Sequence, residues 1–243
     1  ERLFDNELIL TYSKPKFTAE VVGYYMRYSD QLALTGELND VGEATRVNID
    51  DSYRLGLEVN AGYQPMERLQ IGTSLTFSRN RVKKFNEFID DWDTGEKVLI
   101  EHTDTDLAFS PSAIIMGDVK YAFFSNQKHH ATVGLQTKFV GEQFVDNTGN
   151  PASVLDSYTF TDVQFTYDFM WKKGKKASVN FLLRNIFDSK FETNAWIYRF
   201  RSPSYDPTPD DPYSVREGND IYHQKGLYPQ AGINFLLGLT LTI

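Results

Sequence analysis

The feature that most constrains the fold of this chain is a strict alternation of apolar and polar residues that runs for a dozen residues at a time. The same two-residue period covers 52–63, 69–78 and 162–171. At the C-terminal end its apolar members are Ala231, Ile233, Phe235, Leu237, Leu239, Leu241 and Ile243. A period of two is that of a β-strand with two different faces, and no stretch shows the spacing of an amphipathic helix. The sequence therefore predicts an all-β protein.

The length and the polar face of these strands favour a membrane barrel over a soluble sandwich. Strands in soluble sheets average about five or six residues, whereas about 9–11 residues cross a bilayer at the tilt of a barrel strand. The polar faces carry Gly, Ser, Thr, Asn, Gln and charges, which suit a water-filled lumen. Aromatic residues crowd the strand ends, for example Tyr24, Tyr25 and Tyr28, as in an interfacial girdle. We predict an antiparallel transmembrane β-barrel, with a soluble β-sandwich as the alternative.

The links between the expected strands alternate in length. We expect strands at about 2–13, 17–35, 46–63, 68–83, 111–124, 131–146, 157–172, 177–192 and 230–243. The short links are 13–16, 64–67, 125–130 and 173–176, and the long ones are about 36–45, 84–110, 147–156 and 193–229. Short turns at one end and long loops at the other are typical of outer-membrane barrels.

Nine strands are an odd number, whereas bacterial single-chain barrels have an even one. An open sheet edge in hydrocarbon leaves backbone groups unpaired, at a cost of several kcal/mol each. The chain also opens at Glu1, in the middle of a strand pattern. We therefore expect residues 1–243 to be a portion of a longer protein.

Three segments carry a resemblance to a known family. Leu34–Gly42 (LTGELNDVG) is followed by Ser52–Glu58 (SYRLGLE), Val179–Asp188 reads VNFLLRNIFD, and Tyr228–Gly232 reads YPQAG. In this order, these segments resemble the C-terminal part of TonB-dependent outer-membrane receptors. One departure is the last residue, because the family usually ends in an aromatic residue and this chain ends in Ile243.

The resemblance implies the architecture and the role of the whole protein. It implies a 22-stranded barrel filled by an N-terminal plug, of which this chain supplies the last nine strands. The plug, its TonB box and the N-terminal strands would lie outside the sequence. Such a receptor sits in the bacterial outer membrane and imports a scarce nutrient, here expected to be a ferric siderophore or other iron chelate. Its expected partners are membrane lipid, the inner-membrane TonB complex, the small-molecule ligand and surface or periplasmic proteins.

Other function classes find little support in the sequence. There is no cysteine, which excludes disulfides and thiolate chemistry, and no cofactor motif is found. The 25 basic and 33 acidic residues give a net charge of −8, which argues against a nucleic-acid partner. No Gly-x-Ser-x-Gly, His-Glu-x-x-His or phosphate-binding glycine loop occurs, so we predict that the protein is not an enzyme. An outer-membrane lipase or protease barrel and a structural or adhesive barrel stay open as alternatives.

The loop predicted at 84–110 is rich in carboxylates. Residues 90–101 have the length of an EF-hand loop with Gly95 at the sixth position, but Trp92 and Thr94 occupy ligand positions. We therefore predict a solvated loop and no metal site.

The four histidines are the other candidate metal ligands. His102 and His223 fall in predicted outer loops and could ligate haem iron, but they are far apart in the sequence and match no haem motif, so we expect them to be surface histidines. His129 and His130 are expected in a solvated periplasmic corner.

The loop predicted at 193–229 is the main candidate for ligand binding. It combines seven aromatic residues, three arginines and five prolines, so we expect it to fold over the barrel mouth. Aromatic faces and arginines suit an anionic ferric chelate. The predicted ligand-binding residues are Trp196, Tyr198, Arg199, Phe200, Arg201, Tyr205, Tyr213, Arg216 and Tyr222. A loop that packs only on its neighbours is the alternative.

The last strand allows a residue-level prediction of its two faces. Alternation places Ile233, Phe235, Leu237, Leu239 and Leu241 toward lipid. It places Asn234, Thr240 and Thr242 toward the interior.

Overall fold

The computed structural model describes residues 1–172 and 174–242 and consists almost entirely of β-strands. Lys173, expected in a short turn, and Ile243, expected at the end of the last strand, lie outside the described residues. Among the described residues, no helix is both long and apolar enough to span a membrane.

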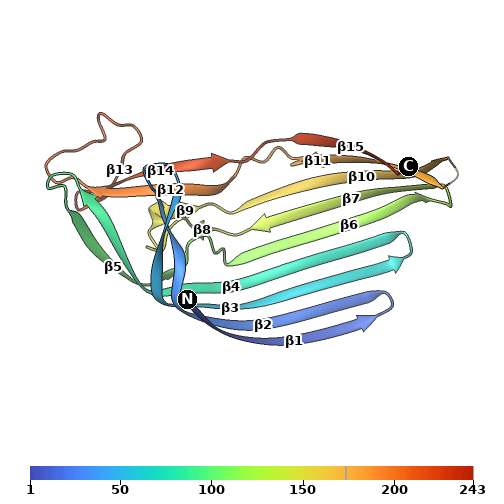
Figure 1. Ribbon diagram of the computed structural model, residues 1–243, viewed down its shortest axis with the longest axis horizontal. Coiled ribbons are helices and arrows are strands. Elements are labelled where there is room, and N and C mark those ends of the chain that lie inside the picture. Colours follow the sequence, from blue (N-terminus) through green and yellow to red (C-terminus); the bar gives the residue numbers. More distant parts are fainter. Residues whose placement is uncertain (173, 243) are drawn as a thin grey trace.

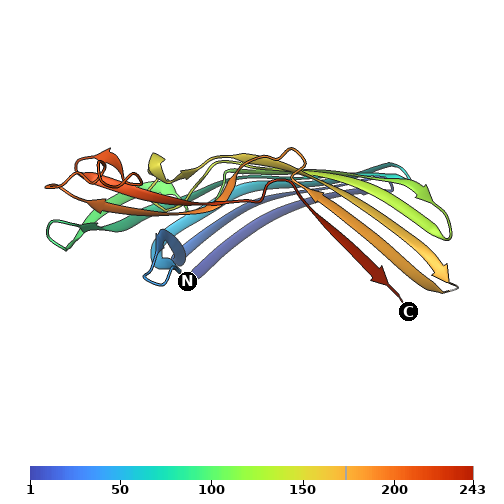
Figure 2. The same ribbon diagram turned by 90° about the horizontal axis from the view of Figure 1, so that it is seen from above.

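The architecture is one curved antiparallel sheet whose strands follow one another in chain order (Figures 1 and 2). Within the described residues its main path has nine strands. They are β1 (Arg2–Lys14), β2 (Phe17–Leu38), β3 (Ala44–Met66), β4 (Leu69–Asp91), β6 (Ala113–Ser125), β7 (His129–Val140), β10 (Tyr158–Lys172), β11 (Lys175–Arg184) and β15 (Asn234–Leu241). This confirms the predicted all-β antiparallel fold.

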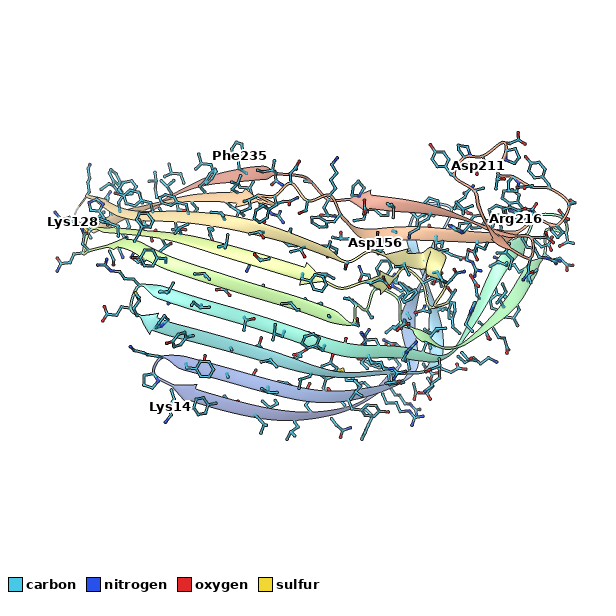
Figure 3. The ribbon with its side chains drawn as sticks, turned by 180° about the vertical axis from the view of Figure 1, so that it is seen from behind. Lys14, Lys128, Asp156, Asp211, Arg216 and Phe235 are labelled. Atoms are coloured by element: carbon cyan, nitrogen blue, oxygen red, sulfur yellow. The ribbon has the colours of Figure 1, made fainter. Side chains whose placement is uncertain are left out.

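Short turns and long connections lie at opposite ends of the sheet, as predicted. Lys14 and Lys128 mark the end with the short turns, and Asp211 and Arg216 mark the other end (Figure 3). We call the second end the distal end. The connection expected at 36–45 is shorter than predicted, because β2 and β3 stay paired as far as Leu38 and Ala44.

The other three long connections contain secondary structure of their own, so their prediction as loops was wrong. β4 continues to Asp91 and pairs with β5 (Lys97–Asp106) as a hairpin. The segment 193–229 forms β12 (Glu192–Arg201), β13 (Val215–Gly218) and β14 (Ile221–Pro229). Between β7 and β10, the short strands β8 (Gln143–Phe144) and β9 (Val154–Leu155) flank the 3-10 turn η1 (Pro151–Ser153).

Two predicted strands end earlier than expected. The strand predicted at 131–146 ends at Val140, and the one predicted at 177–192 ends at Arg184. After Arg184 the chain turns because Asn185 adopts a positive φ of 51°, and its side-chain amide donates to Ser189 O at 2.9 Å and Ala231 O at 3.3 Å. The last strand begins at Asn234, because the backbone N–H of Ile233 donates to Asp188 Oδ1 instead of to a strand partner.

The register separates an apolar face from a polar one across the sheet. One row of directly paired residues on the apolar face is Leu10, Val21, Val59, Leu75, Ile115 and Phe139. The adjacent row on the polar face contains Thr11, Glu20, Asn60 and Ser74. Paired residues share a face of the sheet, so the apolar face is the lipid-facing side and the polar face is the lumen side.

The last strand follows its predicted division. Phe235, Leu237 and Leu239 pair with apolar residues of β11. Thr240 pairs with Ser178 of β11, and Thr240 and Thr242 line a hollow together with Asp168 of β10.

Aromatic residues form two girdles on the lipid-facing side. Near the short turns, Phe17 lies 6.0 Å from Tyr12 and 6.5 Å from Tyr63 between ring centroids. Toward the distal end, Tyr25 and Tyr53 lie 6.3 Å apart. The ten residues from Tyr53 to Tyr63 extend about 34 Å along a strand, and a tilt of 35–45° reduces this to about 24–28 Å, close to the apolar band of roughly 25 Å in outer-membrane barrels.

The structure corrects the predicted girdle and the prediction for His129. Tyr24 and Tyr28 face the lumen because they alternate with Tyr25, and the ring of Tyr24 covers Gly56, where a Cβ would collide with it. His129 is not simply solvated, because it stacks on Tyr167 and its Nδ1 lies 2.8 Å from the Tyr167 hydroxyl.

Candidate functional site

We call the elements at the distal end the distal layer: the ends of β2 and β3, the β4–β5 hairpin, the segment between β7 and β10, and β12–β14. This layer begins where the buried side chains of β4 switch from one face of the strand to the other. On β4 the buried positions change from even-numbered Asn80 and Val82 to odd-numbered Phe85 and Glu87. Opposite this change, Asp104 of β5 adopts a positive φ of 52°. The exchange turns Glu87 toward β12, whose end runs parallel to the end of β4 through Phe200 and Arg201.

A buried ion cluster joins the two distal hairpins. Arg199 of β12 donates through Nη1 to Glu87 Oε1 at 2.8 Å and Oε2 at 2.6 Å. Through Nη2 it donates to Glu217 Oε2 at 2.6 Å, and Nε lies 3.0 Å from Glu217 Oε1. The side chain of Arg199 is only 7% exposed. One guanidinium therefore neutralises two carboxylates that stand on different hairpins.

The two histidines considered as possible haem ligands, His102 and His223, lie at the ends of this cluster. His102 Nε2 is 2.8 Å from Glu87 Oε2, and His223 Nδ1 is 3.0 Å from Glu217 Oε1. Both side chains are largely buried. Because each ring faces its own carboxylate, the structure gives these histidines a place in the ion cluster, and the cluster separates them.

The cluster shifts the pKa of its glutamate on β13. Burial raises the pKa of Glu217, but the adjacent His223 ring and the hydrogen bonds from Arg199 and Asn150 outweigh it and lower this pKa to about 2. Asn150 Nδ2 donates to Glu217 Oε2 at 2.7 Å. Glu217 is therefore ionised at neutral pH, and its charge is stabilised from three directions.

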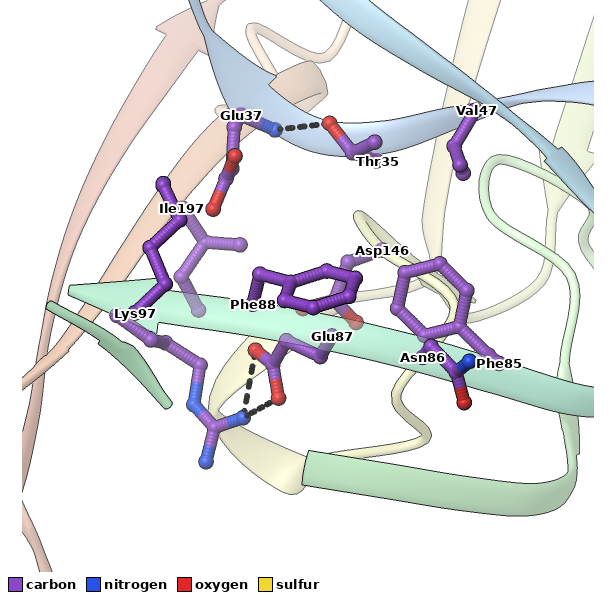
Figure 4. Close-up of a pocket in the computed structure, with 11 residues that line it drawn as sticks. Thr35, Glu37, Val47, Phe85, Asn86, Glu87, Phe88, Lys97, Asp146 and Ile197 are labelled. Carbon is purple, nitrogen blue, oxygen red and sulfur yellow. Dashed lines mark hydrogen bonds and ion pairs between the residues drawn. The ribbon is translucent and has the colours of Figure 1, made fainter. Parts of the chain in front are cut away.

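A cavity of about 280 Å³ lies beside the cluster, between the ends of β2 and β3 and the strands β4 and β12 (Figure 4). Its apolar wall includes Val47, Phe85 and Ile197. Burial raises the pKa of Glu37 and of Asp146, which also line it. The cavity thus combines apolar walls with carboxyl groups that retain protons more readily than in water.

The segment between β7 and β10 holds the distal layer together. Asn147 is fully buried; its Nδ2 donates to Leu34 O at 2.6 Å and its Oδ1 accepts from Ala108 N at 2.8 Å. Lys225 of β14 donates to the backbone oxygen of Val154. The segment therefore ties β2, the β5–β6 connection and β14 to one another.

An aromatic stack lies on the face of β12 opposite Arg199, because Tyr198 and Phe200 alternate with it along the strand. The rings of Trp92 and Phe200 lie 3.9 Å apart with an interplanar angle of 8°. Tyr198 and Tyr222 stack on Phe200 at 5.5 and 5.7 Å. The Tyr198 hydroxyl donates to Asp90 Oδ2 at 3.0 Å and accepts from Trp92 Nε1 at 3.2 Å. This stack fastens the tip of the β4–β5 hairpin to β12.

The structure brings the nine predicted ligand-binding residues to one distal hairpin but gives them different roles. Phe200 and Tyr222 are fully buried in the aromatic stack, and Arg199 is largely buried in the ion cluster. Trp196 lies across Gly226 of β14, and Arg201 pairs with Asp91 at 3.2 Å.

The remaining members lie nearer to solvent. Arg216 pairs with Asp220 and lies 5.7 Å from the centre of the Tyr222 ring. Tyr205, which donates to Asp210, is 48% exposed, and Tyr213 is 77% exposed. Of the nine, these two tyrosines offer their rings most freely to a ligand, and ligand binding stays a prediction.

The predicted acidic loop is an ordered hairpin in which cations face the carboxylates. Its ion pairs are Arg81 with Asp106, Lys83 with Asp104, Lys84 with Glu101 and Lys97 with Asp90. In the part of the chain that the structure describes, no group of three or more potential metal-binding side chains is found. The charge of this segment is thus balanced locally across the two strands.

Several residues of the site escaped the sequence interpretation. Asp146, Asn147, Asn150 and Glu217 belong to no motif, and Glu37 was noted only as part of the segment 34–42 that carries the family resemblance. Their importance follows from burial and from partners that are far away in the sequence.

The sequence of this chain matches a known protein family. The sequence matches the family described as TonB dependent receptor-like, beta-barrel, over residues 6–186. No curated protein matches the chain in sequence.

Solved structures match the fold over nearly the whole chain at low sequence identity. The ferric citrate transporter FecA matches with a TM-score of 0.60 and 19% identity, covering 99% of this chain and 31% of that one. The copper transporter OprC matches with a TM-score of 0.57 and 14% identity, covering 98% and 31%. The ferric yersiniabactin uptake receptor FyuA from Yersinia pestis matches with a TM-score of 0.56 and 14% identity, covering 99% and 30%. This chain therefore spans about a third of the length of these structures.

Proposed function

Because this chain belongs to the TonB-dependent receptor β-barrel family, we propose that it works as part of an outer-membrane receptor for active import. The receptor captures a scarce nutrient at the cell surface and moves it into the periplasm with energy from the inner-membrane TonB complex. We further propose that residues 1–243 are the last nine strands of a 22-stranded barrel whose plug and TonB box lie elsewhere in the protein.

The polar face of the sheet supports a role in transport rather than in catalysis. Thr11, Glu20, Asn60 and Ser74 follow one another across four strands on the side opposite the apolar rows. Such a surface suits a hydrated lumen that contacts a plug and a polar solute. An import receptor needs no catalytic residues, in keeping with the lack of catalytic motifs in the sequence.

We propose an iron chelate, such as a ferric siderophore, as the nutrient. Two of the similar structures bear names that refer to ferric ligands, FecA and FyuA, and the third refers to copper. The exposed rings of Tyr205 and Tyr213 on the distal hairpin offer contact area to an organic chelate. The ion cluster and the aromatic stack beneath them would hold this surface in place.

The observation that carries the proposal is the family match over residues 6–186. Its test is uptake by cells that carry the full-length receptor as their only outer-membrane receptor of this type. Radioactive iron would be supplied as hydroxamate, catecholate or carboxylate chelates, and copper would be supplied separately. We expect uptake of one ferric chelate, and a protonophore that removes the proton gradient should abolish it.

The capture surface is tested with a shortened tip. Replacing residues 203–213 with a tight turn keeps the ion cluster and the aromatic stack, because their members lie outside this range. We expect normal barrel levels and at least tenfold weaker binding of the chelate. Uptake of copper but of no ferric chelate would contradict the substrate class, and uptake that survives the protonophore would contradict the energy source.

A further inference from the structure

Four cations gather on the lipid-facing side of β2 and β4, at the level of the distal aromatic girdle. We call Arg27, Arg79, Arg81 and Lys83 the outer basic belt. Arg27 pairs with Tyr53 across β2 and β3, and Tyr53 pairs with Arg81 across β3 and β4. Lys83 Nζ lies 5.1 Å from the centre of the Tyr53 ring. The belt therefore shares its face and its height with the girdle.

The rows next to the belt place it at the membrane surface. Arg79 pairs with Leu55, which pairs with Tyr25. The next row on the same face is Gly23, Leu57 and Phe77, where the apolar band begins. Tyrosines at the edge of an apolar band mark the level of the lipid headgroups. The cations are thus within reach of headgroups rather than of acyl chains.

The acidic partners of the belt lie at its level or on its distal side. Asp51 pairs with Arg27 at 3.1 Å and Asp104 with Lys83 at 3.6 Å, both one row farther from the membrane than Tyr53. Asp106 pairs with Arg81 at 3.1 Å in the row of Tyr53 itself. Within the described residues, exposed Arg79 in the row nearest the membrane forms no ion pair. The side that faces the membrane is therefore positively charged.

We propose that the outer basic belt binds the phosphorylated headgroup of a lipid in the outer leaflet. Guanidinium groups bind phosphate oxygens bidentately. Arg27 and Arg79 stand on either side of β3 and one row apart. Two strand spacings and two residues along the strand separate their backbones by about 12 Å, so their long side chains can converge on one phosphate. The tyrosines below them would contact the sugar or glycerol part of the headgroup. This inference rests on the register and the charges and is independent of the imported nutrient.

The test is native mass spectrometry of the full-length receptor in detergent with a bisphosphorylated glycolipid, its dephosphorylated form and inorganic phosphate. The double variant Arg27→Gln with Arg79→Gln removes two belt charges. The matched control, Lys120→Gln with Lys176→Gln, removes two exposed charges from the lumen side of β6 and β11. Heat-modifiable migration on gels verifies that each variant is a folded barrel.

We expect the belt variant to bind the bisphosphorylated lipid at least tenfold more weakly, and the control to bind it as the unaltered receptor does. An equal loss in both variants would show that only net charge matters and would overturn the proposal. The same holds if the dephosphorylated lipid binds equally well, or if inorganic phosphate at equal concentration displaces the lipid. A belt variant that does not fold is replaced by Arg79→Gln alone, from which at least threefold weaker binding is expected, because Arg79 supports no ion pair in the described residues.

Discussion

Replacing Arg199 with methionine should release the distal hairpins from each other. The guanidinium is 7% exposed and donates to both Glu87 and Glu217, whose side chains are 10% and 14% exposed. Its removal leaves two carboxylates without their shared cation in a buried site. Breaking a buried ion pair in this way costs about 3–5 kcal/mol.

This cost should appear as local opening and leave the barrel itself intact. Amide hydrogen exchange of the full-length receptor in detergent measures it strand by strand. Since about 1.4 kcal/mol corresponds to a factor of ten, protection in β12 and β14 should fall by about two to three and a half orders of magnitude. Protection in β3 and β10 should not change, because these strands pair outside the cluster.

Two matched variants test whether the ion cluster holds the distal hairpins together. Arg216→Met removes an arginine whose side chain is 53% exposed, from a pair with Asp220, and should cost about 0–1 kcal/mol. Replacing Arg199, Glu87 and Glu217 together with methionine should restore part of the protection, because no buried carboxylate is then left without its arginine, although His102, His223 and Asn150 lose their glutamate partners. If Arg199→Met leaves exchange in β12 unchanged, or if the triple variant is no better than the single one, the cluster does not hold the hairpins together.

Three further predictions concern pH, lipid exposure and the segment between β7 and β10. The pKa of Glu217 is lowered from 4.5 to about 2, so its contribution to the stability of the distal layer is fully present above about pH 4.5 and is lost as the pH falls toward 2. Amide hydrogen exchange in β13 should become faster over this pH range. Exchange protection that does not change with pH would contradict this prediction. Leu237→Arg should destabilise the barrel by about 2–4 kcal/mol near the middle of the membrane and Thr240→Arg by much less, so equal losses of heat-modifiable barrel would refute the assignment of the two faces. Asn147→Ala removes two buried hydrogen bonds of 2.6 and 2.8 Å and should destabilise the distal layer by about 2–4 kcal/mol. Faster amide exchange at Leu34 and Ala108 would show this loss. Unchanged slow exchange at both residues would show that the segment between β7 and β10 does not hold β2 and the β5–β6 connection in place.

The sequence determined the fold class and the two faces of the transmembrane strands. This was possible because a strand places successive side chains on opposite faces, so that the face of Leu237 or Thr240 can be read from its immediate neighbours. The short turns were equally local, since a turn between paired strands needs only a few polar or glycine residues. Aromatic residues near strand ends indicated the membrane interface, although only the register showed that Tyr25 belongs to the lipid-facing girdle and Tyr24 to the lumen.

Only the tertiary structure decided how the distal layer is built. The buried side chains of β4 switch faces opposite Asp104, a non-glycine residue with a positive φ. No sequence pattern predicted this backbone conformation. Glu87 and Arg199 are 112 residues apart, and Asn147 bonds to a carbonyl 113 residues away. The identity of a residue gives its charge and polarity directly. Which residue it contacts depends on how the sheet curves and where the distal hairpins meet. For this reason the composition of segment 193–229 was enough to select the nine candidate ligand-binding residues. Only the folded structure showed which of them belong to the buried ion cluster, which to the aromatic stack and which have exposed rings.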